Sequence, residues 1–179
     1  KENRPFAIVV KKGTFDTYKF TPQIIDEDLM SREESLDIIL NQLADESIIV
    51  STTGKTSREI FEIREKNGQP HIKDFLTVGS MGHCSSIALG IAIAKPDRKV
   101  FCIDGDGALI MHMGSLSTIG NLKPKNLHHI LINNYVHESV GGQKTTIKSM
   151  DVPNLIKSAG YKNVFTVDDR VCLKDQIIN

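Results

Sequence analysis

The sequence predicts an α/β fold, a doubly wound and mainly parallel sheet with helices on both faces. Strand-like and helix-like segments alternate from residue 47 to the end of the chain, and this alternation favours parallel strands joined by helices. The strand-like segments, "KVFCID" among them, are continuous apolar runs, as in sheets that are buried on both faces. With 179 residues, 40% of them hydrophobic and 25% charged, the chain is long enough for one domain with a core.

The expected elements follow one another in a regular order. Ser31 and Glu34 form a capping-box pattern, and the apolar residues that follow at helical spacing predict a helix to Leu43. Further helices are expected at residues 57–66, 83–94, 108–120, 152–160 and 171–179. Strands are expected at residues 47–52, 74–78, 99–104, 128–133 and 163–167. Before Ser31, we expect a short strand at residues 6–10 and a linker at residues 11–30, where no regular period is found.

Composition argues against several classes of function. Lys plus Arg and Asp plus Glu number 22 each, whereas a nucleic-acid binder usually has a basic surplus. The cysteines Cys84, Cys102 and Cys172 show no CxxC spacing, which favours reduced thiols and a cytoplasmic protein. No apolar run approaches the length of a membrane span, and no signal peptide is evident. Because the sequence starts at Lys1 rather than at Met, we expect it to be a piece of a longer protein.

The stretch "STTGKTSRE" contains Gly-Lys-Thr after an expected strand, as a P-loop does. A P-loop also needs a glycine five residues before the Gly-Lys pair, and Ile49 stands at that position. The favoured interpretation is therefore a strand-to-helix turn. Its place at the carboxyl end of a strand would allow it to form the lip of a ligand pocket.

The main signal for a functional site is "DGDG" at the end of the "KVFCID" strand. Gly105 and Gly107 would let the backbone approach a ligand and direct amides at an anion. Asp106 supplies a carboxylate, and Asn134 ends the next strand. With a backbone carbonyl from Val136, these oxygens suit Mg²⁺, which fills its other positions with water and phosphate oxygens. The alternative is a structural turn in which Asp106 only caps the next helix.

The chain contains four stretches that resemble the carboxyl-terminal half of the phosphonopyruvate decarboxylases: "TTGKTSRE", "GSMGHCSSIALGIA", "DGDGALIMHMGSLSTIG" and "NNYVHESVGGQKT". GDG followed by Asn-Asn at the end of the next strand resembles the motif of the wider superfamily of thiamine diphosphate-dependent 2-keto acid decarboxylases. The resemblance covers most of residues 48–147. It implies the thiamine diphosphate-binding fold and, as cofactors, thiamine diphosphate and Mg²⁺.

The resemblance also implies roles for individual residues. The metal ligands would be Asp106, Asn134 and the carbonyl of Val136. The residues that approach the cofactor would be Gly79, Ser80, Met81, Gly82, Gly105, Gly107 and Ala108. Of these, Met81 would lie under the bent cofactor and support its two rings in a V shape, for which a flexible thioether is suited. The alternative for Met81 is simple filling of the core.

The implied reaction is decarboxylation of 3-phosphonopyruvate to phosphonoacetaldehyde and CO₂, in which the cofactor acts as the electron sink. His83 and His137 are the candidates for proton transfer, because imidazole titrates near neutral pH. Three further histidines are expected to be structural: His112, inside an apolar helix, and His128 and His129, in a strand. The cations that could contact a phosphonate are Lys55, Arg58 and Lys144, although each is more typical of a solvated surface charge.

Enzymes of this superfamily also need a glutamate that activates the aminopyrimidine ring, and it comes from a second domain, usually that of a neighbouring subunit. The resemblance therefore implies an N-terminal pyrimidine-binding domain and a homo-oligomer as partners, with a small 2-keto acid as substrate. Residues 1–30 would be the last strand of that domain plus a linker. Residues 31–179 would be the diphosphate- and Mg²⁺-binding domain, truncated at its C-terminus and inactive alone.

Two alternatives stay open. A beta-type subunit of sulfopyruvate decarboxylase, or another 2-keto acid decarboxylase, would share the cofactor residues and differ in its acid. A non-enzymatic α/β module that binds Mg²⁺ at strand-end carboxylates and receives a phosphoryl group belongs to another class. It would need several acidic strand ends and a lysine at a late strand, and "HHILINN" supplies amides instead.

Overall fold

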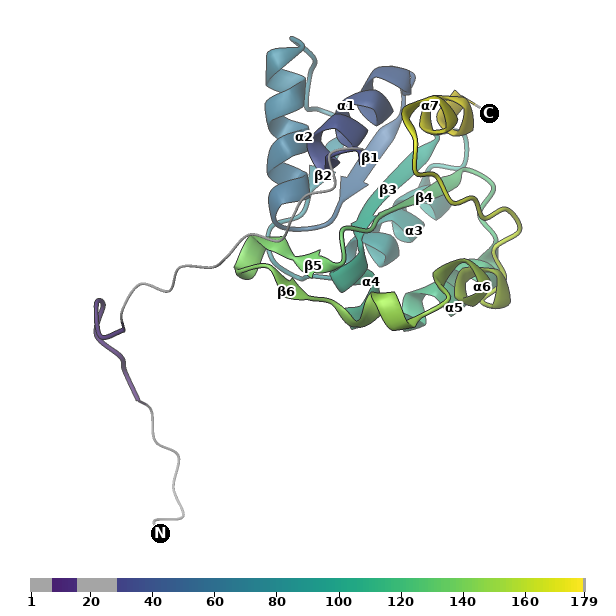
Figure 1. Cartoon of the computed structure of the whole chain (residues 1–179). Helices are drawn as coiled ribbons and strands as arrows, with labels where there is room; N and C mark the ends of the chain where they lie inside the picture. Colours follow the sequence, from purple (N-terminus) through teal and green to yellow (C-terminus); the bar gives the residue numbers. More distant parts are fainter. Residues whose placement is uncertain (1–7, 16–28, 179) are drawn as a thin grey trace.

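The computed structural model describes residues 8–15 and 29–178. At its centre is a four-stranded sheet in which every pairing is parallel and the strand order is β2-β1-β3-β4. The strands are β1 (Ile48–Ser51), β2 (Asp74–Leu76), β3 (Val100–Gly105) and β4 (Leu127–Ile132). The chain enters at β1, moves outward to β2 and then crosses back to β3, so the sheet is doubly wound as predicted (Figure 1).

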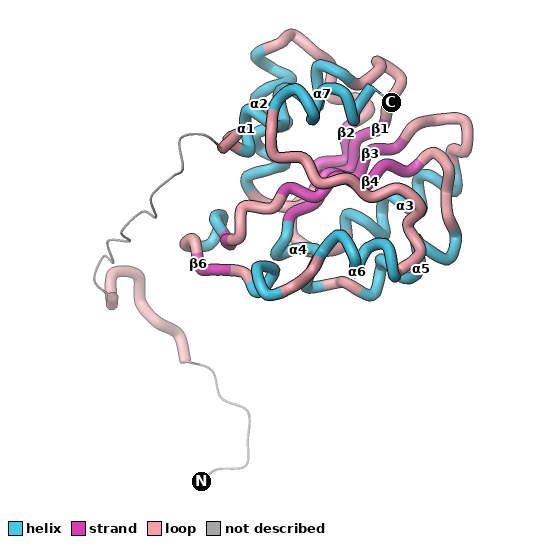
Figure 2. Tube along the Cα trace, turned by 45° about the vertical axis from the view of Figure 1, so that its right-hand side comes forward, coloured by secondary structure: helices cyan, strands magenta, loops and turns pink. Residues whose placement is uncertain are grey.

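Helices cover both faces of this sheet. They are α1 (Arg32–Gln42), α2 (Lys55–Lys66), α3 (Cys84–Ala94), α4 (Asp106–Met111), α5 (Gly114–Leu122), α6 (Val152–Ser158) and α7 (Arg170–Ile178). Both views place α1, α2 and α7 on one face and α3, α5 and α6 on the other (Figures 1 and 2). A short antiparallel pair, β5 (Val136–His137) and β6 (Gln143–Lys144), follows β4. Within the described residues, no helix is long and apolar enough to cross a membrane.

The alternation of side chains along β3 explains why both faces need helices. Ile103 belongs to the apolar cluster formed with α1, α2 and α7, whereas Cys102 belongs to the cluster formed with α3. Both side chains are fully buried. Successive strand residues point to opposite faces, so a strand that is apolar at every position requires a cover on each side. The fold class predicted from these runs is confirmed.

The start of α1 follows the predicted capping pattern in part. The Oγ of Ser31 accepts a hydrogen bond from the backbone N–H of Glu34 at 3.1 Å. The Glu34 carboxylate does not return to the cap and instead accepts from Arg170 of α7 at 2.5 Å. This guanidinium holds the pKa of Glu34 below its usual range. The side chain that the sequence assigns to the cap therefore links the first helix to the last.

The prediction of one continuous helix at residues 108–120 is wrong. The segment is divided into α4 and α5 by a turn at His112 and Met113. His112 is exposed at this turn rather than buried inside a helix, and its ring lies against His83 with centroids 4.0 Å apart. The apolar residues on both sides of the break share one cluster, as Leu109 and Leu116 show. Apolar spacing alone could not reveal the break, because both short helices bury their residues in the same place.

The strand expected at residues 163–167 is also wrong. No residue of this segment is assigned to a strand, and Phe165 is 65% exposed. Only Val167 packs against the cluster under α7. The β-forming residue types are present, yet they have no backbone partner here, and β-propensity depends on such context. Of the strand expected at 6–10, residues 8–10 are exposed and form no strand. Residues 6 and 7, and residues 16–28 of the expected linker, lie outside the described part.

Gly120 lies where α5 meets the end of α6, and this contact predicts a stability effect. A Cβ at Gly120 would be 1.8 Å from the carbonyl oxygen of Ala159, so the backbone of one helix must move. We expect Gly120→Ala to lower the free energy of unfolding by about 1–3 kcal/mol. The matched control is Gly90→Ala in α3, where a Cβ would meet nothing within 4 Å. Urea unfolding compares them, and equal midpoints for the two variants would contradict the close contact.

Candidate active site

A cavity of about 220 Å³ lies at the carboxyl ends of β1, β3 and β4, where ligands of doubly wound sheets bind. Many of the residues singled out in the sequence line it: Met81, Gly105, Asp106, Gly107, Ala108, Asn134, Val136 and His137. These residues come from three separate stretches of the chain. The topology therefore brings together most of the predicted cofactor and metal residues in one place.

Asp106 begins α4 directly after β3 ends, and its side-chain carboxyl group is buried. The residue is 3% exposed, and its Oδ2 accepts a hydrogen bond from the Oγ1 of Thr145 at 2.5 Å. A buried carboxylate is costly unless it is paired or binds a cation. The first backbone amides of α4 have no intrahelical acceptors, so they are available to an anionic group at this end of the sheet. The arrangement suits a cation beside an anionic group.

Gly107 allows the closest approach at the site. A Cβ at this position would be 2.4 Å from the Cε1 of His137 and 3.1 Å from the Cε of Met81. Any larger residue would push these side chains out of the cavity. The absence of a side chain at Gly107 thus lets an imidazole and a thioether converge on the start of α4.

Asn134 lies in a tight turn after β4. Its Oδ1 accepts a hydrogen bond from the backbone N–H of Val136 at 3.2 Å. Tyr135, between them, has φ +63°, a left-handed conformation that is uncommon for a residue with a Cβ and that clusters at functional sites. The backbone of Tyr135 is held by Thr145, whose N–H donates to the Tyr135 carbonyl at 2.8 Å. Thr145 therefore contacts both of the segments that carry the predicted metal ligands.

The loop after β1 also lines the cavity, and the sequence identified it only as a candidate lip. The Oγ1 of Thr52 is buried and has no hydrogen-bond partner in the described part of the chain. A buried hydroxyl without a partner costs about 1–3 kcal/mol, so the site fits a ligand that supplies the missing bond. Gly54 has φ +101°, and a Cβ there would be 2.6 Å from the Oγ of Ser139. The Gly-Lys-Thr after a strand was the signal for this loop.

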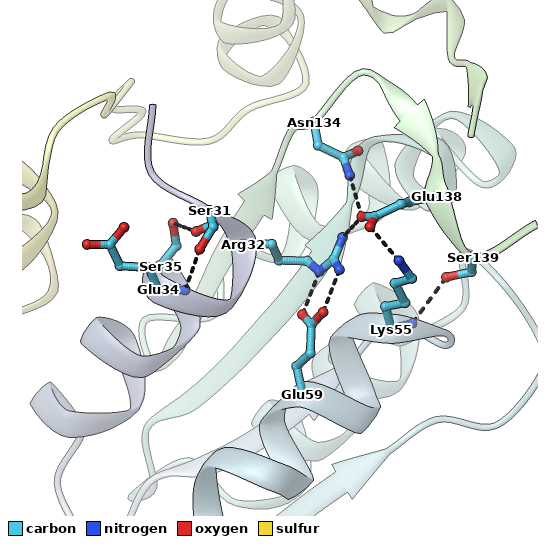
Figure 3. Close-up of polar contacts among 9 residues, drawn as sticks. All are labelled: Ser31, Arg32, Glu34, Ser35, Lys55, Glu59, Asn134, Glu138 and Ser139. Carbon is cyan, nitrogen blue, oxygen red and sulfur yellow. Dashed lines mark hydrogen bonds and ion pairs between the residues drawn. The ribbon is translucent and has the colours of Figure 1, made fainter. Parts of the chain in front are cut away.

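A network of charged side chains includes three residues of the cavity lining, Arg32, Lys55 and Glu138 (Figure 3). Arg32 donates to both oxygens of Glu59 at 2.6 and 2.5 Å and also donates to Glu138. Lys55 donates to the other oxygen of Glu138. The hydrogen bond from Lys55, followed by that from Arg32, holds the pKa of Glu138 below its usual range, and the bonds to Glu59 raise that of Arg32. Sequence reasoning missed Arg32 and Glu138, because they are 106 positions apart.

The other predicted residues lie beside the cavity rather than in its lining. They are Gly79, Ser80, Gly82 and His83. The loop that contains them is tied to the lining, because the N–H of Gly79 donates to the Oγ1 of Thr53 at 2.9 Å. Ser80 has φ +49°. Among the cations considered for a phosphonate, Lys55 lines the cavity, whereas Arg58 and Lys144 are exposed and do not.

The two histidines expected to be structural in β4 are engaged in packing and in hydrogen bonds. His128 stacks on Phe101 with ring centroids 4.6 Å apart, and burial together with the nearby Lys99 lowers its pKa. The Nε2 of His129 is 3.1 Å from Asp104, and its Nδ1 is 3.0 Å from the hydroxyl of Tyr161. Neither ring lines the cavity. Their positions agree with the prediction.

The fold and the cavity define a doubly wound α/β domain with a ligand-sized cavity at the carboxyl ends of its parallel strands. Residues 52–178 match the family "Thiamine pyrophosphate enzyme, C-terminal TPP binding domain". This chain belongs to that family. Thiamine pyrophosphate (TPP) is another name for thiamine diphosphate, so the family agrees with the resemblance found in the sequence. The family assignment leaves no support for a phosphoryl-receiving module.

The relatives that this chain matches are named as enzymes. The chain is 38% identical over 134 residues to the phosphonopyruvate decarboxylase of Streptomyces viridochromogenes, covering 75% of this chain and 32% of that protein. It is 39% identical over 129 residues to the sulfopyruvate decarboxylase subunit beta of Methanocaldococcus jannaschii, covering 72% of this chain and 65% of that subunit. The chain thus spans about a third of the length of the phosphonopyruvate decarboxylase it matches.

The fold also matches a solved structure. Benzoylformate decarboxylase from Polynucleobacter necessarius superimposes with a TM-score of 0.64 at 15% identity, over 83% of this chain and 30% of that one. At this identity the likeness supports the fold alone. It agrees with the parallel sheet and its two helical layers, and it confirms the predicted thiamine diphosphate-binding fold.

Proposed function

We propose that this chain is the diphosphate- and Mg²⁺-binding part of a thiamine diphosphate-dependent enzyme that decarboxylates 3-phosphonopyruvate to phosphonoacetaldehyde and CO₂. The observation that carries the proposal is the buried carboxylate of Asp106 in the same cavity as the hydroxyl of Thr52, which has no hydrogen-bond partner among the described residues. A cation would stabilise the carboxylate of Asp106, and a hydrogen-bonding group would satisfy the hydroxyl of Thr52. A metal-bound diphosphate supplies both.

In this proposal Asp106, the Oδ1 of Asn134 and the carbonyl of Val136 hold Mg²⁺, which neutralises the diphosphate. The backbone at Gly105, Gly107 and Ala108 lies against the phosphates, and Gly79, Ser80 and Gly82 border the cofactor. When bound, the cofactor supplies an electron sink for the loss of CO₂.

Met81 and His137 both lie close to the place that a Cβ of Gly107 would take, and each is assigned a role in the proposal. Met81 packs beneath the two rings of the cofactor and supports their relative orientation. His137, within the lining, holds or moves a proton near the diphosphate end, and His83 is proposed for the same task from the loop beside the cavity. The histidine pair His83 and His112 is exposed, so a proton can reach His83 from solvent.

The activating glutamate is proposed to come from a pyrimidine-binding domain in a homo-oligomer, as the resemblance implies. Residues 1–30 would belong to the exit of that domain and residues 31–179 to the domain described here. A cytoplasmic location is part of the proposal, because Cys84, Cys102 and Cys172 are all free thiols.

A second candidate, the beta subunit of a sulfopyruvate decarboxylase, is favoured by the 39% identity to the M. jannaschii subunit, of which this chain spans 65%. Turnover by the enzyme that contains this chain separates the two. We expect release of CO₂ from 3-phosphonopyruvate with a kcat/KM at least about tenfold above that for sulfopyruvate, a difference of about 1.4 kcal/mol in transition-state binding. A preference for sulfopyruvate would establish the second candidate, and turnover of neither acid would overturn the decarboxylase proposal.

A further inference from the structure

Glu138 contacts the predicted metal ligand Asn134 through the NH₂ of its side-chain amide. The Nδ2 of Asn134 donates to the Oε2 of Glu138 at 3.3 Å, while its Oδ1 accepts from the N–H of Val136. We propose that Glu138 is a positioning residue, which fixes the side-chain amide of Asn134 with its oxygen toward Mg²⁺. This inference rests on the proposed function, because it takes Asn134 to be a ligand of the metal.

The chemistry of the two groups selects one orientation. An asparagine amide has an oxygen on one side and an NH₂ on the other, of nearly the same shape, and only the oxygen can bind a cation. An ionised carboxylate is a pure acceptor, so Glu138 can pair only with the NH₂ of Asn134. The oxygen must then face away from Glu138. One of its lone pairs serves the N–H of Val136, and the second remains for a metal.

Glu138 is itself held in place by cations from two helices. Arg32, the first residue of α1, and Lys55, the first residue of α2, each donate to one of its oxygens. Arg32 is only 12% exposed and is fixed by its double hydrogen bond to Glu59. Figure 3 shows Arg32 and Lys55 reaching Glu138 from α1 and α2, and Glu138 itself follows β5. The position of the Asn134 amide is thereby set by residues that the metal itself does not touch.

Residues that form hydrogen bonds with a metal ligand have a measurable effect on metal affinity. Loss of a hydrogen-bond partner to a metal ligand typically weakens metal affinity by about 10–100-fold. Glu138→Gln keeps the size of the side chain, but its amide can present either NH₂ or oxygen to Asn134. The selection of one orientation is then lost, while the cavity keeps its shape. Glu138→Gln should therefore change the dependence on Mg²⁺ and leave the metal-free contacts with the cofactor unchanged.

The experiment measures thiamine diphosphate binding by equilibrium dialysis at increasing Mg²⁺. We expect Glu138→Gln to raise the half-saturating Mg²⁺ concentration by about tenfold or more, with unchanged binding in EDTA. The matched control is Glu34→Gln. The side chain of Glu34 is 38% exposed, as is that of Glu138, and it also pairs with an arginine, Arg170. Unlike Glu138, it does not line the cavity. This control should keep the wild-type Mg²⁺ dependence.

A double variant separates orientation from general loss of structure. In Asn134→Asp with Glu138→Gln, both side-chain oxygens at position 134 can bind a metal, and the net charge of the pair is unchanged. We expect this exchange to restore most of the lost sensitivity to Mg²⁺. Wild-type Mg²⁺ dependence in Glu138→Gln, or no recovery in the double variant, would overturn the positioning role of Glu138. Neither result would overturn the proposed function of the chain. Absence of Mg²⁺-dependent binding in the wild-type protein would overturn the proposed function as well.

Discussion

Replacing Asp106 by alanine is expected to weaken Mg²⁺-dependent binding of thiamine diphosphate by more than about 100-fold, beyond the effect of losing an outer partner of a ligand. The reason is that Asp106 supplies the buried negative charge that faces the cation in the proposed site. Its one side-chain partner in the described structure is the hydroxyl of Thr145, which cannot replace a carboxylate. Equilibrium dialysis with Mg²⁺ in excess measures the change.

Folding of this variant is the necessary control. In the cofactor-free protein Asp106 is a buried carboxylate without a cation, which costs free energy. We therefore expect Asp106→Ala to leave the melting temperature of the cofactor-free protein within a few degrees of the wild type. Asp151→Ala, which removes the N-cap acceptor of α6 away from the cavity, should leave cofactor binding unchanged. Binding of wild-type strength in Asp106→Ala would mean that the carboxylate is only a structural acceptor for the hydroxyl of Thr145.

Replacing Asp104 by alanine is expected to destabilise the protein by about 2–5 kcal/mol. Asp104 is fully buried, and its two oxygens accept from the N–H of Gly105 at 2.8 Å and pair with the Nε2 of His129 at 3.1 Å. Alanine would leave these buried groups without an acceptor. Tyr161 continues the network through the Nδ1 of His129, and burial raises the pKa of its phenol above the usual range.

Urea unfolding measures this loss. Asp104→Asn keeps an oxygen for Gly105 but presents an NH₂ to His129, so an intermediate loss is expected. The thiols of Cys84 and Cys102 lie within 4.8 Å of the same carboxylate, and the contact with Cys84, with burial, raises the pKa of Cys102. A thiol sulfur is only a weak hydrogen-bond acceptor, so these cysteines are poor replacements for the carboxylate of Asp104. A loss below about 1 kcal/mol, the size of an ordinary net hydrogen bond, would contradict the structural role of Asp104.

The two carboxylates of "DGDG" thus have different tasks. Asp104 is the last side chain of β3 and faces the buried network, whereas Asp106 is the first residue of α4 and lines the cavity. Gly105 separates them at the turn from strand to helix. The sequence predicted a place for Asp106 in a ligand site, because glycines on both sides of a strand-end carboxylate are typical of such a site, and Asp106 does line the cavity. The sequence carried no signal for the partner of Asp104, which comes from another strand.

Local sequence patterns predicted those strands and helices whose formation depends mainly on neighbouring residues. The four apolar runs form β1 to β4, and the Ser31 pattern caps α1. The same reasoning failed at 163–167, where strand-forming residues lack a neighbouring strand, and at His112, where one apolar pattern spans two helices. The charged network at the cavity was missed for a related reason. Ion pairs between distant positions produce no periodic pattern in the sequence, so only the structure shows that Arg32 and Glu138 form a pair.

The central claim, that the chain forms the metal and diphosphate half of a thiamine diphosphate site, is tested most directly by calorimetry. The protein that contains this chain is titrated with thiamine diphosphate in excess Mg²⁺ and again in EDTA. The account predicts saturable binding with one site per chain, weakened by about tenfold or more without the metal, because Mg²⁺ joins the carboxylate to the phosphates. Equal affinity in Mg²⁺ and EDTA, or no binding in either, would contradict it.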